Sequence, residues 1–90
     1  MKIVINTCYG GFSVSKKACE KLGIDWEECH GYIDLKRNDP KLVAVVEELG
    51  EKANGTHAAL RITEIPDGVD WVIEEYDGNE WVAEKHRVWR

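Results

Sequence analysis

The sequence predicts an α+β fold: a mostly antiparallel sheet, made of an N-terminal strand and a C-terminal β-meander, with two helices packed on one face. Three observations predict it. Residues 2–6 are a short run rich in β-branched side chains, residues 40–53 repeat apolar side chains at helical spacing, and residues 60–82 alternate apolar and polar positions. Ninety residues suit one domain, so residues 1–90 are expected to form a single unit.

The first strand, residues 2–6, is apolar on both faces and is therefore expected to be central in the sheet. A helix is predicted over residues 14–22. Ser13 or Ser15 is its cap, because a serine hydroxyl can accept from a free backbone N–H of the first turn. Gly23 stands where a left-handed residue ends a helix.

The second helix, residues 40–53, carries the clearest signals. Asp39 is its predicted cap, and Pro40 takes the first helical position, where its missing N–H costs nothing. Gly50 disfavours the last turns, so the helix is expected to end at Asn54-Gly55 or to loosen at Gly50. Its apolar stripe consists of Leu42, Val45, Val46, Leu49 and Ala53.

Residues 24–38 show no sustained period. Asp25 is expected to start a brief helical turn that Trp26 anchors, and residues 32–35 are expected to form a short edge strand.

The meander has two predicted turns, at residues 66–68 and at Asp77-Gly78. The second is a strong signal for a two-residue hairpin loop, because Asp-Gly accepts positive φ at both positions. Counting outward from it predicts the pairs Tyr76 with Asn79, Glu75 with Glu80, Glu74 with Trp81, Ile73 with Val82 and Trp71 with Glu84.

This register places Glu75 opposite Glu80 on the face assigned to the core, although like charges across a pair are destabilising. One interpretation is that the hairpin protrudes and water solvates both carboxylates. The other is a site for a cation or a basic partner group, which Glu84 would join.

Composition and net charge disfavour several classes of function. A hydrophobic content of 43% is typical of a folded protein, and a net charge of −5 disfavours direct nucleic-acid binding. Three cysteines, an odd number without a CxxC motif, indicate reduced thiols. No signal peptide or membrane-spanning run is visible, so we expect a cytoplasmic protein that does not bind a membrane.

A strand, a glycine loop and a helix start form a candidate anion site, because free backbone N–H groups and the helix dipole point the same way. The alternative is a tight connection whose glycines only allow the turn, with Phe12 and Tyr9 in the core. The candidate ligand-binding residues are Cys8, Tyr9, Gly10, Gly11, Phe12, Ser13 and Ser15.

Cys8 allows a third hypothesis, a cysteine-dependent enzyme, because a thiol near a helix start can become a nucleophile. No positioned base for such a nucleophile is visible in the sequence. Cysteines at uneven intervals do not match a zinc site, and no metal or cofactor is expected.

Trp89 near the C-terminus is a large apolar side chain that favours burial. It either folds back on the sheet or contacts another chain. A homo-oligomer anchored by Trp89 and Trp81 is therefore expected.

Three runs carry a resemblance: CYGGFSVS, RNDPKLVAVVEELGEKANG and IPDGVDWVIEEYDGNEWVAEKHRVW. With them the chain resembles a family of small, largely uncharacterised phage and prophage proteins. The resemblance implies a non-catalytic accessory protein in the cytosol of a bacterial host. Such a protein would bind a host protein or sequester a small molecule of host defence.

Two hypotheses follow. In the first, the glycine loop captures an anionic small molecule such as a nucleotide defence signal, with Tyr9 or a tryptophan stacking on its base. In the second, the acidic hairpin inhibits a host factor by docking on a basic surface. The candidate partner-binding residues are Glu74, Glu75, Asp77, Glu80, Trp81 and Trp89.

Overall fold

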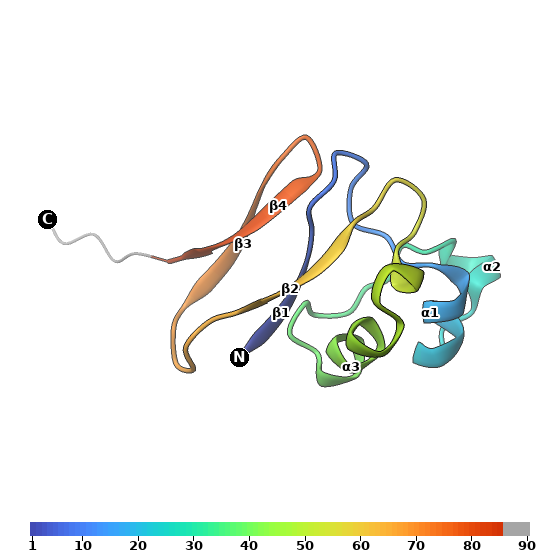
Figure 1. Cartoon of the computed structure of the whole chain (residues 1–90), viewed down its shortest axis with the longest axis horizontal. Helices are drawn as coiled ribbons and strands as arrows, with labels where there is room; N and C mark the ends of the chain where they lie inside the picture. Colours follow the sequence, from blue (N-terminus) through green and yellow to red (C-terminus); the bar gives the residue numbers. More distant parts are fainter. Residues whose placement is uncertain (86–90) are drawn as a thin grey trace, which may run out of the picture.

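The computed structural model describes residues 1–85 and confirms the α+β class. Figure 1 shows the helices and strands, coloured in their order along the chain. The strands are β1 (Lys2–Asn6), β2 (Leu60–Glu64), β3 (Trp71–Tyr76) and β4 (Asn79–Glu84). The helices are α1 (Lys16–Leu22), α2 (Trp26–Cys29), α3 (Pro40–Leu49) and the 3₁₀ helix η1 (Gly50–Ala53).

The strands form two antiparallel pairs, β1 with β2 and β3 with β4. The prediction of one continuous meander is wrong, because β2 and β3 do not pair. Each flank of the turn at residues 66–68 has another partner: the Ile65 N–H donates to the Met1 carbonyl at 2.9 Å, and the Asp70 carbonyl accepts from Lys85 at 2.8 Å. The β3–β4 pairing has the predicted register throughout.

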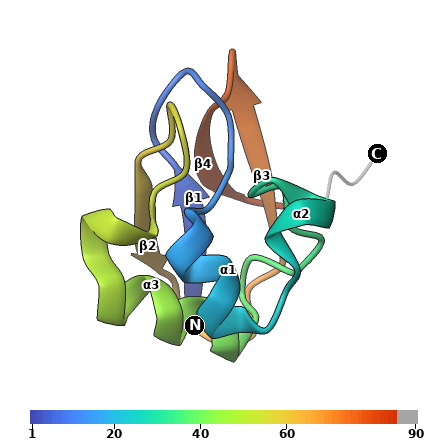
Figure 2. The ribbon, with the colours of Figure 1, turned by 90° about the vertical axis from the view of Figure 1, so that its right-hand side faces the viewer.

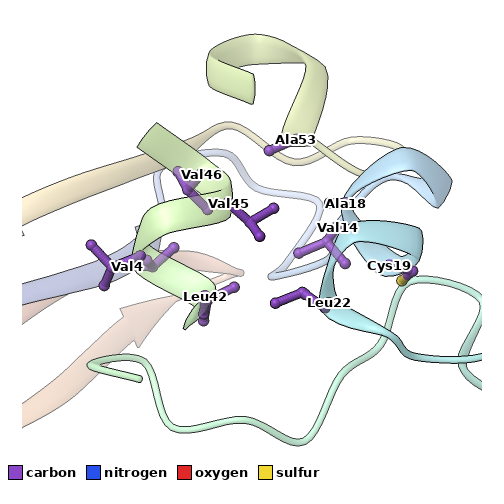
Figure 3. Close-up of a cluster of buried hydrophobic side chains, with 10 residues drawn as sticks. Val4, Val14, Ala18, Cys19, Leu22, Leu42, Val45, Val46 and Ala53 are labelled. Carbon is purple, nitrogen blue, oxygen red and sulfur yellow. The ribbon is translucent and has the colours of Figure 1, made fainter. Parts of the chain in front are cut away.

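The β1–β2 pair lies between the helices and the β3–β4 hairpin (Figures 1 and 2). α1 and α3 pack on one face, as predicted, and Val4 of β1 points into their core (Figure 3). Ile3 and Ile5 point to the opposite face and are also buried. The core consists of Val4, Val14, Ala18, Cys19, Leu22, Leu42, Val43, Val45, Val46 and Ala53.

The first helix begins and ends through local capping. α1 follows Ser15, whose Oγ accepts from the Ala18 N–H at 3.1 Å, so Ser15 and not Ser13 is the cap. Gly23, at φ 74°, ends it in the predicted left-handed conformation.

α3 also follows its predicted signals. Asp39 caps it, and it ends at Leu49 because Gly50 adopts φ 56°. The chain then continues as η1, so the helix loosens at Gly50 as predicted.

The structure of residues 24–38, the stretch without a sustained period, agrees with the prediction in part. Asp25 caps α2, and Trp26 packs against the core. The edge strand expected at residues 32–35 is wrong. Gly31 turns the backbone at φ 93°, and the Tyr32 N–H bonds back to the Cys29 carbonyl at 2.9 Å.

Candidate functional site

Three connecting segments meet at one end of the molecule: the glycine loop (residues 7–13), residues 54–58 and the hairpin turn Asp77-Gly78 (Figures 1 and 2). Asn6, the fully buried last residue of β1, joins all three. Its Nδ2 donates to the carbonyls of Cys8 and Gly78, both at 2.7 Å. Its Oδ1 accepts from the backbone N–H of Ala59, the residue that directly follows residues 54–58, at 2.9 Å. One satisfied amide therefore fixes where the hairpin turn lies.

Glycine occurs where these backbones touch. A Cβ at Gly10 would overlap the backbone and Cβ of His57, and a Cβ at Gly78 would lie 2.6 Å from the Tyr9 carbonyl oxygen. Gly11 differs, because nothing lies within 4 Å of its Cβ position and its φ is 88°. Backbone packing and turn conformation thus account for these glycines without a ligand.

The serines of the proposed anion site are engaged within the protein. Ser15 Oγ donates to the Lys52 carbonyl at 2.6 Å, and the buried Ser13 Oγ bonds to the Thr56 carbonyl at 3.5 Å. Val14, which bridges to Asn54, separates the glycine loop from the start of α1. No pocket is present in the part of the chain that the structure describes.

The remaining loop residues point in different directions. Phe12 is partly buried, and the Arg37 guanidinium carbon lies 3.6 Å above its ring centroid. Tyr9 is 65% exposed, so the expectation that it enters the core is wrong. Cys8 is half-buried, and the cysteine-dependent enzyme stays a prediction. Across residues 1–85, no three His, Cys, Asp or Glu side chains gather to hold a metal ion.

Glu80 is the charged residue whose surroundings differ most from the sequence-based prediction. It is only 9% exposed, so the expectation that water solvates both Glu75 and Glu80 is wrong for Glu80. Arg37 donates to both of its oxygens, from Nη1 at 2.6 Å and from Nη2 at 2.9 Å. The backbone N–H of Asn6 donates to Oε1 at 2.8 Å. The basic group that Glu80 binds belongs to the same chain, so Glu80 does not offer a free carboxylate to a partner.

These contacts also correct the expectation that β1 is a central strand. β1 has a strand neighbour on one side only. On the other side, the Val4 N–H donates to the Arg37 carbonyl at 2.8 Å and the Asn6 N–H donates to Glu80. Arg37, which the sequence analysis missed, thus takes the place of a neighbouring strand together with Glu80.

The rest of the hairpin end is exposed and acidic. Glu74, Glu75 and Asp77 are exposed, and Glu84 is exposed further down the hairpin. Within residues 1–85, the ion pairs engage Asp67, Glu47, Glu48 and Glu80, so the carboxylates of Glu74, Glu75 and Asp77 have no ion-pair partner there.

Aromatic side chains accompany these carboxylates. Tyr76 is 74% exposed and Trp81, directly opposite Glu74, is 44% exposed. Tyr9 joins them from the glycine loop, whose backbone touches Gly78. We name this end of the molecule the acidic tip; it consists of Tyr9, Glu74, Glu75, Tyr76, Asp77 and Trp81. Glu74, Tyr76 and Trp81 share one face of the hairpin, and Glu75 lies on the other face, opposite Glu80.

The C-terminal tryptophan and the membrane prediction are the last two points of the sequence analysis. Trp89 lies outside the described residues, and the homo-oligomer anchored by Trp81 and Trp89 stays a prediction. None of the helices in residues 1–85 has the length and apolar character needed to cross a membrane.

Comparisons with known proteins found no match among protein-family models, curated proteins or solved structures.

Proposed function

We propose that this chain is a non-catalytic, phage-type accessory protein of the bacterial cytosol, and that its acidic tip inhibits a host protein by docking on a basic segment. The observation that carries the proposal is a combination on one end of the molecule: three carboxylates that form no ion pair within residues 1–85, and three exposed aromatic side chains.

Lysine and arginine side chains match this surface in two ways. Carboxylates attract the cation, and the faces of Tyr76 and Trp81 can bind it through cation–π contacts, worth about 0.5–2 kcal/mol each. Charge complementarity of this kind also speeds encounter and excludes acidic partners. Arg37 neutralises the negative charge of Glu80, so the negative charge of the tip comes from Glu74, Glu75 and Asp77.

The tip is also held in place before binding. Asn6 anchors the hairpin turn through the Gly78 carbonyl, and the turn residues Asp77 and Gly78 both adopt positive φ. A surface that is fixed in advance loses little conformational entropy on binding.

Capture of an anionic small molecule at the glycine loop is the other hypothesis, and the local charge works against it. The loop backbone at Tyr9 and Gly11 touches Gly78, next to Asp77. An anion bound there would lie near the negative charge of the acidic tip, which opposes its binding. Mass spectrometry of molecules released from the denatured protein tests this hypothesis, and a recovered nucleotide would favour it over docking.

Capture of host proteins on the immobilised chain tests the docking proposal. The tip variant Glu74→Gln/Glu75→Gln/Asp77→Asn removes three charges and keeps side-chain size, and asparagine tolerates the φ of 52° at position 77. The control variant Glu20→Gln/Glu28→Gln/Glu51→Gln removes three exposed charges elsewhere.

A specific host protein should be retained by the parent and the control variant and lost from the tip variant. Its retention should also fall between about 0.05 M and about 0.5 M salt, because salt screens exposed charges. Equal retention by the parent and the tip variant would contradict docking through the tip.

A further inference from the structure

Two of the three cysteines lie side by side in the helical layer. Cys19 is on α1, Cys29 is the last residue of α2, and their Sγ atoms are 3.5 Å apart. A disulfide needs about 2.05 Å between the sulfurs, so a small approach separates the two thiols from a covalent bond. Cys8 lies in the glycine loop and is not part of this pair.

The two sulfurs differ in access. Cys19 is fully buried, whereas Cys29 is half-buried and is therefore the more accessible of the two. The Gly31 N–H donates to Cys29 Sγ at 3.4 Å and fixes the position of that sulfur.

The element that carries Cys29 is suited to the movement that a bond requires. α2 has four residues, none of which is buried. Left-handed residues flank it, Gly23 at φ 74° before it and His30 at φ 49° after it. Trp26 and Cys29 pack against the core cluster without being fully buried, so a short element of this kind can shift more easily than α1 or α3.

We propose that Cys19 and Cys29 form a redox-active dithiol, which a low-molecular-weight disulfide such as oxidised glutathione converts into an intramolecular disulfide. The site uses no residue of the acidic tip, and the inference does not depend on the docking proposal.

The chemistry proceeds in two exchanges. The Cys29 thiolate attacks one sulfur of oxidised glutathione, forms a mixed disulfide and releases one glutathione thiolate. Cys19 then loses its proton, attacks the Cys29 sulfur and releases the second glutathione. The two protein thiols give up two electrons in total, and the glutathione disulfide takes them up.

The order of the exchanges follows from burial. Desolvation, the largest cause, raises the pKa of the Cys19 thiol from 9.0 to about 12. Cys19 is therefore a poor first nucleophile. It reacts in the second exchange, after Cys29 has bound glutathione, which then serves as the leaving group.

The test treats the full chain with oxidised glutathione, blocks remaining thiols with N-ethylmaleimide and measures the mass. The parent should lose two hydrogen atoms, about 2 Da, and take up one label, at Cys8, instead of three. The Cys8→Ala variant should still lose two hydrogens and take up no label. A peptide map should then join Cys19 to Cys29, and a reductant should restore both thiols.

Cys29→Ala is the matched loss variant, because its half-buried position tolerates truncation better than the buried Cys19 does. It should form no intramolecular disulfide. The oxidised parent should also melt at a higher temperature than the reduced parent, since the bond constrains the unfolded chain. Three labelled cysteines after oxidation, a mixed disulfide that persists at Cys29, or a bond that includes Cys8 would overturn the inference.

Discussion

Arg37 and Glu80, 43 residues apart in the sequence, form a two-point ion pair with donor–acceptor distances of 2.6 and 2.9 Å. The pair lies along the edge of β1 that has no strand neighbour. Arg37 supplies its carbonyl to Val4, and Glu80 supplies a carboxylate oxygen to Asn6. The Arg37 backbone carbonyl and the Glu80 side chain thus satisfy two N–H groups that a third strand would otherwise satisfy. The ion pair between the two side chains joins the hairpin to the rest of the fold.

Replacing Glu80 with Gln should destabilise the protein by about 2–4 kcal/mol, because it leaves the Arg37 guanidinium without its counter-charge in a largely buried place. Glu75→Gln is the matched control. Glu75 lies directly opposite Glu80 in the hairpin but is exposed, so its loss should change the free energy of unfolding by less than about 0.5 kcal/mol. Urea unfolding measures both, and equal effects would contradict the structural role of the pair.

Asn6→Asp should be more destabilising than a typical core substitution. The two carbonyls of Cys8 and Gly78 accept from the Asn6 amide, and a carboxylate can donate to neither. We expect a loss of about 3 kcal/mol or more in the free energy of unfolding. Asn38→Asp, in a half-buried position without such carbonyl contacts, provides the comparison. If the two variants were equally stable, the anchoring of the hairpin turn by Asn6 would be wrong.

Gly10→Ala and Gly11→Ala separate packing from conformation. A Cβ at Gly10 overlaps the His57 backbone, so the glycine loop must move away from residues 54–58. Gly11→Ala meets open space and adds only strain from its φ of 88°, about 1–2 kcal/mol. Thermal unfolding should therefore show the larger loss for Gly10→Ala. The reverse order would show that the loops do not touch as described.

Stability should fall in the alkaline range because of Cys19. Its pKa in the folded protein, about 12, exceeds the ordinary value of 9.0. Between these values the folded state keeps a proton that the unfolded state has lost, so the free energy of unfolding falls as pH rises from about 9 to about 12. Below pH 9 the contribution is fully present.

The Cys19→Ala variant isolates this contribution. It is less stable overall, because it loses a buried sulfur, but its stability should fall less between about pH 8 and about pH 10.5. The rest of the sequence is the same in both proteins, so the comparison isolates the contribution of position 19. Parallel pH profiles would show that Cys19 ionises normally.

Local signals in the sequence predicted the hairpin and narrowed the helix ends: α1 begins at Lys16 instead of residue 14, and α3 ends at Leu49, the earlier of its two expected ends. Ser15, Asp39 and Gly23 act on neighbouring residues, so their roles depend on nothing distant. Asp77-Gly78 determines the register of the whole hairpin, because pairing is counted outward from a two-residue turn.

Contacts between distant segments could not be predicted in the same way. The alternation of β2 and β3 is compatible with a meander, and it is the strand pairing of the structure, β1 with β2 and β3 with β4, that shows otherwise. Arg37 stands in an aperiodic stretch without a local partner. The signal that pointed to it was Glu80, a carboxylate on an apolar face, which called for a cation without indicating which one.

The acidic tip was predicted in part for the same reason. Glu74, Glu75 and Asp77 follow from the hairpin register and are exposed as the protein-interaction hypothesis requires. Glu80 is buried and paired with Arg37, so it is not part of this exposed end. Tyr9 was assigned to the glycine loop alone, because its proximity to Gly78 depends on the buried amide of Asn6.

Site-specific photocross-linking in host cells tests the central claim most directly. Tyr76 and Tyr32 are equally exposed, at 74% and 71%, but Tyr76 lies in the acidic tip and Tyr32 lies between α2 and α3. A benzophenone amino acid at position 76 should cross-link a host protein, and the same probe at position 32 should not. A host protein cross-linked from position 32, with none from position 76 at equal expression, would contradict docking through the tip.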